Sequence, residues 1–404
     1  MKYIDGGVCS AKGFRAGGLN CGIKAGSTKK DLAMIVSDTM CSAAAVYTTN
    51  KVKGAPLAVT KAHLINGRAQ AVICNSGNAN TCAPNGMEIA EETCRITADA
   101  LGMEAEDIIV CSTGVIGQEL SIKPFESGVP QLAEKISYDG GQEAAEAIMT
   151  TDTIPKSIAV EFEIDEKTCY IGGIAKGSGM IDPNMATMLS FITTDAAISP
   201  EMLDKALKQD VKTSYNQICV DGDMSTNDTV AVLASGLCGN EEITEENDEF
   251  EAFCEALSMV TMYLAKKLAR DGEGATKLIE CQVEGAPDEE TAAKVSKTVI
   301  SSNLLKAAIF GADANWGRVL CAIGYTDGDF STENIDVEMA SDKGGVLVCQ
   351  GSRHKEYSEE EASKILSEEE ILIRVDLHQG DASATAWGCD LTYDYVKING
   401  DYRS

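Results

Sequence analysis

Segments with the periodicity of β-strands and segments with the periodicity of α-helices follow one another along the chain. Apolar and polar residues alternate over 158–164 and again over 371–377, which is typical of half-buried, antiparallel strands. Apolar residues recur every three or four positions over 253–268, which predicts one apolar stripe on a helix that Gly272 ends. Ser199-Pro200 predicts the start of another helix, because serine caps helix N-termini and proline fits the first turn. This mixture predicts an α/β or α+β sandwich.

The length of 404 residues favours two domains over one. Residues 284–290 have the composition of a linker and follow a strand-like stretch over 278–283. We therefore expect a larger domain over 1–284 and a smaller C-terminal domain over 285–404.

The chain is strongly acidic. It has 34 lysine and arginine residues against 63 aspartate and glutamate residues, a net charge of −29. Such a charge repels phosphate backbones and anionic lipid heads, so we expect neither a nucleic-acid nor a membrane partner. No apolar run approaches the ~18 residues of a membrane helix, and residues 1–7 contain no apolar signal core. These features predict a cytoplasmic protein.

The metal-binding and nucleotide-binding patterns that are easiest to recognise are incomplete here. Fifteen cysteines occur without a C-x-x-C pair, and the three histidines are scattered, so neither a zinc site nor a disulfide framework is indicated. Residues 177–182 begin like a dinucleotide fingerprint but place Asp182 at the third glycine position. Residues 221–232 resemble a calcium loop but end in Val232 instead of glutamate. No G-x-S-x-G serine elbow is present.

The stretch from Gly172 to Leu189 is the most unusual part of the sequence. It places an isolated lysine among glycines, then a Pro-Asn turn, and then Thr187 at the start of an apolar strand. Read from its residues alone, it suits a glycine-rich connection into a buried strand. It also allows a threonine that becomes a nucleophile once the preceding bond is cut, because the new α-amine can replace a histidine base.

The motifs of this stretch and of the rest of the chain resemble those of the self-cleaving ornithine acetyltransferase (glutamate N-acetyltransferase) family of arginine biosynthesis, often bifunctional as N-acetylglutamate synthase. The resemblance covers essentially the whole chain, in the order 75–80 (NSGNAN), 112–117 (STGVIG), 149–153 (MTTDT), 176–181 (KGSGMI), 185–189 (MATML), 220–223 (VDGD) with 227–228 (ND), 271–277 (DGEGATK), 311–318 (GADANWGR) and 395–404 (YVKINGDYRS).

The resemblance implies that the chain cleaves itself between Ala186 and Thr187, giving an α chain over 1–186 and a β chain over 187–404. Thr187 would then act as the nucleophile that takes the acetyl group, with its own amine accepting the hydroxyl proton. It also implies an oxyanion hole made by the Thr113 hydroxyl and the Gly114 N–H. The substrate-binding positions that it implies are Thr150, Lys176, Thr187, Glu273, Asn399 and Ser404.

The implied reaction moves an acetyl group from N2-acetylornithine to glutamate through an acetyl-threonine. The implied fold is the α/β (α+β) sandwich of the ornithine acetyltransferase and D-aminopeptidase type with a smaller C-terminal α+β domain. The implied assembly is a heterotetramer of two α and two β chains. Neither a metal nor a cofactor is expected, although acetyl-CoA would be a substrate of a bifunctional enzyme.

Two other readings remain open at this point. A self-cleaving N-terminal-threonine aminopeptidase or amidase would use the same nucleophile but pass the acyl group to water; the match at Lys176, Glu273 and the C-terminus argues against it. A non-enzymatic acidic binding protein would use the acidic segments at 241–255 and 359–370 and would keep its chain intact.

Overall fold

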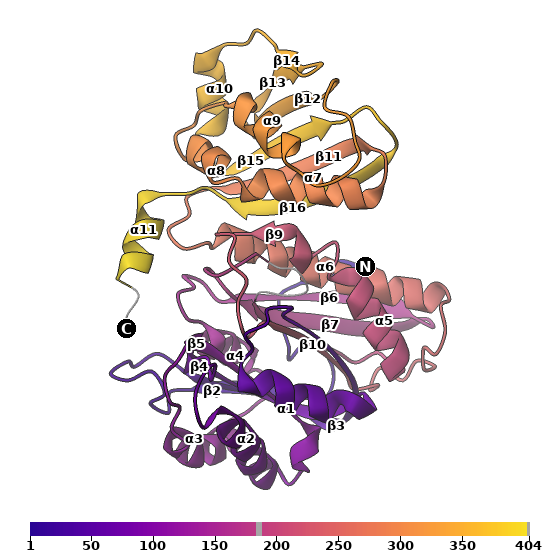
Figure 1. Cartoon of the computed structure of the whole chain (residues 1–404). Coiled ribbons are helices and arrows are strands. Elements are labelled where there is room, and N and C mark those ends of the chain that lie inside the picture. The colour runs from indigo at the N-terminus through magenta and orange to yellow at the C-terminus, as the bar shows by residue number, and fades with distance from the viewer. Residues whose placement is uncertain (183–187, 402–404) are drawn as a thin grey trace. The chain divides into compact units, whose positions relative to one another are not determined.

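The computed structural model describes residues 1–182 and 188–401 (Figure 1). The chain divides into two compact units. The first unit contains residues 1–177, 183–216 and 224–264, and the second contains 178–182, 217–223 and 265–404. Among the residues that the structure describes, no helix has both the length and the apolar character needed to cross a membrane.

The first unit is built on one large mixed sheet. Eight of its strands follow the spatial order β1–β6–β7–β8–β10–β3–β4–β5, and β2 pairs with β3. Their bounds are β1 Lys2–Ile4, β2 Phe14–Leu19, β3 Leu32–Tyr47, β4 Arg68–Asn78, β5 Ile108–Val115, β6 Lys156–Ile164, β7 Lys167–Lys176, β8 Leu189–Thr194 and β10 Thr229–Ala234. The expected strand over 158–164 is therefore present, and it pairs antiparallel with β7.

The sheet folds back on itself through the long strand β3. Its first part pairs with β2 and β4, its last part pairs with β10, and its register with β4 shifts between Val36 and Cys41. One buried cluster contains Ile35 of β3 together with Ile174 of β7 and Phe191 of β8. The apolar interior of this unit therefore lies between the two halves of the sheet, as expected for a sandwich.

Helices cover the outer faces of the first unit, except for α4 (Gly141–Ile148), whose buried residues belong to the cluster between the two halves of the sheet. Helices α1, α2 and α3 lie beside β3, β4 and β5 (Figure 1), and buried residues of these six elements form a second cluster. On β7, Gly173 lies directly against Val260 and Leu264 of α6, where a larger side chain would press on both. The helices are α1 Ala55–His63, α2 Gly86–Leu101, α3 Lys123–Ala133, α4 Gly141–Ile148, α5 Pro200–Asp210 and α6 Asp248–Arg270, which continues into the second unit.

Two of the helices that the sequence predicts are confirmed. Ser199 caps α5, and its side chain accepts a hydrogen bond from the backbone N–H of Met202. The apolar stripe over 253–268 lies in α6, which ends at Arg270, two residues before Gly272.

The second unit is a mixed sheet with helices of its own. Its strands follow the order β14–β13–β12–β15–β11–β16–β9. Their bounds are β9 Ile218–Cys219, β11 Leu278–Ala286, β12 Asp336–Ser341, β13 Gly344–Gln350, β14 Arg353–His354, β15 Glu370–Asp376 and β16 Ala382–Cys389. The helices are α7 Glu289–Ser301, α8 Asn303–Phe310, α9 Trp316–Gly324, α10 Glu359–Leu366 and α11 Tyr393–Gly400. Buried residues of α7 to α10 join those of the strands in one core.

The structure corrects two expectations. Residues 278–286 form one continuous strand, β11, so the linker composition near residue 285 does not mark a boundary, and the contiguous part of the second unit begins at residue 265. The strand expected over 371–377 is β15 (Glu370–Asp376), an interior strand that is antiparallel to β12 but parallel to β11. Nine of the fifteen cysteines are buried, in line with their expected role as small core residues.

Candidate active site

Thr113 and Gly114 lie near the end of β5, where this strand runs parallel to β4. In the register of the two strands, Thr113 is opposite Ser76 and Gly114 is opposite Gly77. Gly114 has a φ of 130°, and a Cβ placed on it would lie 2.3 Å from the carbonyl carbon of Gly77. Only glycine fits both this backbone angle and this close approach. The strand end therefore presents a fixed N–H next to the Thr113 hydroxyl.

Buried amide side chains hold this strand end in place. The hydroxyl of Ser112, the residue before Thr113, donates to Asn75 Oδ1 at 2.6 Å. The Nδ2 atom of Asn227 donates to the carbonyl of Ser112 at 2.9 Å, and Thr81 Oγ1 donates to Asn227 Oδ1 at 2.5 Å. Because the buried polar groups of this network are hydrogen-bonded to one another, they hold the backbone at Ser112 in one position.

Lys176 brings a positive charge to Thr113. It is the last residue of β7, lies opposite Leu189 of β8, and has an exposed fraction of 7%. Its Nζ donates a hydrogen bond to Thr113 Oγ1 at 3.2 Å. The structure therefore brings together two residues that are 63 positions apart and that the family resemblance assigned to one site.

Asp152 organises the surroundings of Lys176. Its Oδ1 accepts hydrogen bonds from Lys156 Nζ at 2.7 Å and from the backbone N–H of Gly177 at 2.6 Å. Burial raises the pKa of this carboxyl group, but the charges of Lys156 and Lys176 outweigh burial and bring the pKa to about 2. The carboxylate is therefore ionised at every physiological pH.

Thr150 lies at a pocket of about 450 Å³ in the first unit. Its backbone N–H donates to Asp152 Oδ2 at 3.0 Å. Lys24 lies in the wall of the same pocket, and its Nζ donates to the carbonyl of Met149 at 2.8 Å. Burial lowers the pKa of Lys24. The residues that line the pocket are Lys24, Thr28, Lys29, Lys30, Glu146, Met149, Thr150, Asp152 and Thr153.

Asp228 is a second buried carboxyl group in the first unit. It directly precedes β10, whose first residue, Thr229, pairs with Leu189 of β8. Burial raises its pKa well above the ordinary range of an aspartate, and the charge of Lys176 opposes this only in part. The pKa of Asp228 is therefore shifted in the opposite direction from that of Asp152.

In the second unit, Glu273 and Asn399 form a pair. Asn399 Nδ2, on α11, donates to Glu273 Oε2 at 2.7 Å. The backbone N–H of Glu273 donates to the carbonyl of Ser178 at 2.8 Å. A Cβ placed on Gly179 would lie 2.5 Å from the carboxyl carbon of Glu273. The absence of a side chain at Gly179 therefore leaves room for this carboxylate.

Asp221, in the VDGD motif, anchors the same segment. Its two carboxylate oxygens accept hydrogen bonds from the backbone N–H groups of Met180, at 2.7 Å, and Ile181, at 2.9 Å. Tyr395 of α11 also donates to Asp221, at 3.2 Å. This carboxylate thus binds the backbone at Met180 and Ile181, a few residues before the expected cleavage site.

The predicted residues Ala186, Thr187 and Ser404 lie outside the described residues. The residues that the sequence did not single out are Lys24, Asp152, Asp221, Asn227 and Asp228. Four of these five, all except Lys24, belong to the motifs that carry the family resemblance.

Comparisons with known proteins identify the family. The ArgJ family model matches residues 15–404. An arginine biosynthesis bifunctional protein ArgJ from Caldanaerobacter subterraneus subsp. tengcongensis is 48% identical over 405 residues, which cover 100% of both chains. The protein of the same name from Symbiobacterium thermophilum is 49% identical over 406 residues, again covering 100% of both chains.

A solved structure agrees with these relatives. The crystal structure of arginine biosynthesis bifunctional protein argJ from Bacillus halodurans matches with a TM-score of 0.51 and 48% identity, and covers 54% of this chain and 100% of that chain. The similarity confirms the expected α/β sandwich. The chain therefore belongs to the ArgJ family, the ornithine acetyltransferases of arginine biosynthesis that its motifs resemble.

Proposed function

We propose that this chain is a glutamate N-acetyltransferase, which moves the acetyl group of N2-acetylornithine to glutamate through an acetyl ester on Thr187. The observation that carries the proposal is the hydrogen bond from Lys176 to Thr113 beside the Gly114 N–H, in a chain whose relatives are named arginine biosynthesis proteins over their full length.

The first step is cleavage of the Ala186–Thr187 bond, which releases the α-amine of Thr187. An α-amine has a pKa of about 7.7–8.0, so about a tenth to a sixth of it is unprotonated at pH 7 and can accept the hydroxyl proton. The match with the Bacillus halodurans chain supports this step. That chain is matched along its whole length but covers 54% of the present chain, the share that residues 187–404, 218 of 404, make up.

The second step is attack of the Thr187 oxygen on the acetyl carbonyl, which places a negative charge on the carbonyl oxygen. Lys176 Nζ donates to Thr113 Oγ1 and so occupies an acceptor position of that oxygen. The hydroxyl proton of Thr113 therefore points elsewhere, and with the Gly114 N–H it makes two donors for the oxyanion. The ammonium group also raises the acidity of the hydroxyl, which strengthens its hydrogen bond to an anion.

Ornithine then leaves, and the amine of glutamate attacks the acetyl-threonine through the reverse of these steps. We assign Lys176 and Thr150 to the substrate carboxylate side, and Glu273, hydrogen-bonded by Asn399, to a substrate amine. Ser404 completes this set of binding residues in our proposal. The chemistry needs neither a metal nor a cofactor. Because both relatives are named bifunctional, we include acetyl-CoA as a second acetyl donor. We also propose an assembly of two α and two β chains.

The proposal is tested by intact-mass measurement and kinetics. The purified protein should consist of chains 1–186 and 187–404, and donor alone should add one acetyl group to the chain that starts at Thr187. Initial-rate lines for N-acetylornithine and glutamate should be parallel, because the first product leaves before the acceptor reacts. Thr187→Ala should remain uncleaved and inactive, whereas Thr187→Ser retains a hydroxyl and should cleave slowly. An active, uncleaved wild-type chain would refute the nucleophile. Release of acetate at the same rate with and without glutamate would identify a hydrolase instead.

A further inference from the structure

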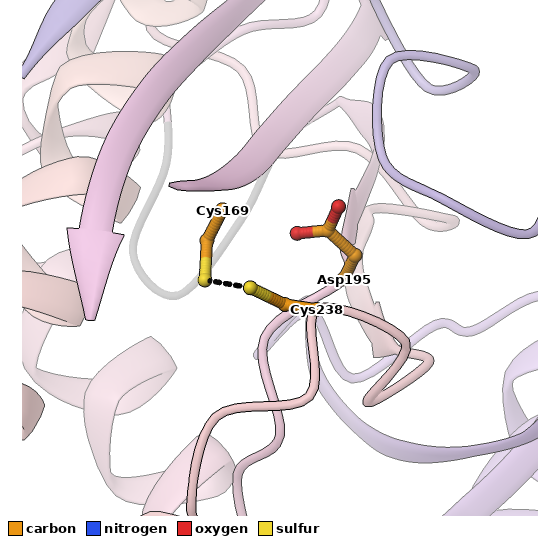
Figure 2. Close-up of side chains that lie close together, drawn as sticks. All are labelled: Cys169, Asp195 and Cys238. Atoms are coloured by element: carbon orange, nitrogen blue, oxygen red, sulfur yellow. Dashed lines mark hydrogen bonds between the residues drawn. The ribbon is translucent and has the colours of Figure 1, made fainter. Parts of the chain in front are cut away.

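Two cysteine side chains meet at the far end of β7 from Lys176. Cys169 is near the start of β7, and Cys238 lies in the loop that follows β10. The two sulfur atoms are 2.6 Å apart (Figure 2). Cys169 is buried and Cys238 is partly exposed. This distance is shorter than the contact of two non-bonded sulfur atoms and close to a covalent one, which is about 2.05 Å.

Asp195 fixes the backbone on both sides of this pair. Its Oδ1 accepts a hydrogen bond from the backbone N–H of Tyr170, next to Cys169, at 2.7 Å. Its carbonyl accepts from the backbone N–H of Cys238 at 2.7 Å. Because one buried residue holds both cysteines, their sulfurs are already aligned and little chain entropy is lost when they join.

The side chains of Cys169, Cys238 and Asp195 are arranged less well for binding a metal ion than the two cysteines are for forming a disulfide. Two thiolates that bind one tetrahedral zinc ion lie about 3.8 Å apart, given Zn–S bonds of about 2.3 Å. In addition, both carboxylate oxygens of Asp195 are engaged by backbone N–H groups, those of Tyr170 and Lys12. A thiol pair of this geometry favours a sulfur–sulfur bond over a shared ion.

We propose that Cys169 and Cys238 form a reversible disulfide when the protein meets a small-molecule disulfide or a peroxide. The bond between Ala186 and Thr187 lies between these two cysteines in the sequence. If the proposed self-cleavage occurs, the disulfide therefore joins the α chain to the β chain. This second part rests on the proposed function, whereas formation of the disulfide does not.

The reaction with oxidised glutathione illustrates the chemistry. Cys238, the more accessible residue, attacks one glutathione sulfur as its thiolate and displaces one glutathione thiolate, which gives a mixed disulfide. The Cys169 sulfur then attacks the Cys238 sulfur, loses its proton to solvent and displaces the second glutathione thiolate. Two electrons pass from the cysteine pair to glutathione, and reduced dithiothreitol reverses the sequence.

The test is electrophoresis of the full-length protein in denaturing gels after treatment with oxidised glutathione. Without reductant, the wild type should give one band at the mass of the intact chain, 42.7 kDa, and dithiothreitol should resolve it into two. Cys169→Ser and Cys238→Ser should each give two bands in both gels. The control Cys321→Ser, at an exposed cysteine outside this pair, should behave as the wild type. Two bands from the oxidised wild type without reductant would overturn the link.

Peptide mapping separates failure of this proposal from failure of self-cleavage. If the chain is not cleaved, one band remains in every lane, but the cross-linked peptide of Cys169 and Cys238 should still appear in the digest of the oxidised wild type. Absence of that peptide overturns the disulfide whether or not the chain is cut. Zinc bound at one ion per chain and lost in Cys238→Ser, a substitution at a partly exposed site, would also overturn it in favour of a metal site.

Discussion

Lys176 Nζ lies 3.2 Å from Thr113 Oγ1, so the last side chain of β7 and a side chain near the end of β5 form one hydrogen-bonded unit. A lysine ammonium has three protons, and it can bind a hydroxyl and a carboxylate at the same time. If Lys176 binds the substrate carboxylate and Thr113 binds the oxyanion, as proposed above, this hydrogen bond couples substrate binding to the orientation of an oxyanion donor.

This coupling should be measurable as non-additivity. We expect Lys176→Met and Thr113→Val each to lower kcat/KM by about a hundredfold, the typical loss of one oxyanion donor. The double variant should lose much less than the product of the two, because each single change already breaks the shared hydrogen bond. Lys61→Met, on the exposed side of α1, is the control and should leave kcat/KM unchanged. Independent, multiplicative losses would show that the two residues act separately.

The backbone at Gly114 should not tolerate a side chain. Gly114→Ala places a Cβ against the carbonyl of Gly77 at a φ of 130°, so the strand end must move and the N–H is misplaced. We expect a loss of at least a hundredfold in kcat. Gly117→Ala is the matched control, since Gly117 also has a positive φ but has open space around it. It should cost about 1 kcal/mol of stability and little activity. Equal kcat values for the two variants would argue against a precise role of the Gly114 N–H.

Asp152 should make the stability of the protein depend on acid. Its pKa of about 2 in the folded state lies below the unfolded value of about 3.9, so it stabilises the fold above pH 4. That contribution, about 2 kcal/mol, is lost as the pH falls from 4 towards 2. Asp152→Asn should lower the urea midpoint strongly at pH 7, where it leaves Lys156 buried without its charge partner, and much less at pH 2.5.

The control for this pH dependence is Asp99→Asn. Asp99 is 68% exposed and pairs with Arg95 on the surface of α2, where ion pairs contribute little. Its urea midpoint should follow the wild type at both pH values. A gap between Asp152→Asn and the wild type that stays constant with pH would contradict the assignment of a depressed pKa.

The pair of Glu273 and Asn399 should affect substrate binding more than chemistry. Asn399→Ala removes a 2.7 Å hydrogen bond to the carboxylate, and we expect KM for N-acetylornithine to rise about tenfold with a small change in kcat. Asn399→Asp adds a like charge and should raise KM further. Lys397→Ala, two residues away on an exposed position of α11, is the control. An unchanged KM in both Asn399 variants would remove this pair from the substrate-binding residues.

The sequence predicted the sandwich architecture and several of its elements for identifiable reasons. Alternation over 158–164 and helical spacing over 253–268 are local patterns, and each element formed where its pattern predicted it. The strand β15 shows the limit of this reasoning, because period-two alternation does not reveal that one neighbour is parallel. The expected boundary near 285 failed for a related reason, since Gly285 and Pro287 resemble a linker although residue 285 is part of β11.

The supporting residues of the site could not be recognised from local patterns. Two lysines lower the pKa of Asp152. Lys156 is four positions away in the sequence, but Lys176 is the last residue of β7. Asp221 binds the backbone at Met180 and Ile181, some forty residues earlier in the chain. Such contacts arise only when the sheet has formed. The pairing of Cys169 with Cys238 is equally invisible in the sequence, because 69 residues separate them.

The central position of β8 has a consequence for the folding history of the protein. This strand pairs with β7 on one side and β10 on the other, and residue 187 is two positions before its first residue, Leu189. If the bond before Thr187 is cut, the ladder between β7 and β8 remains, but it becomes a contact between separate molecules. The uncut chain folds in a unimolecular process, whereas the cut enzyme, once unfolded, must reassemble from two dilute partners. The newly made, uncut chain would then fold readily, whereas the cut protein would refold slowly after unfolding, at a rate that depends on its concentration.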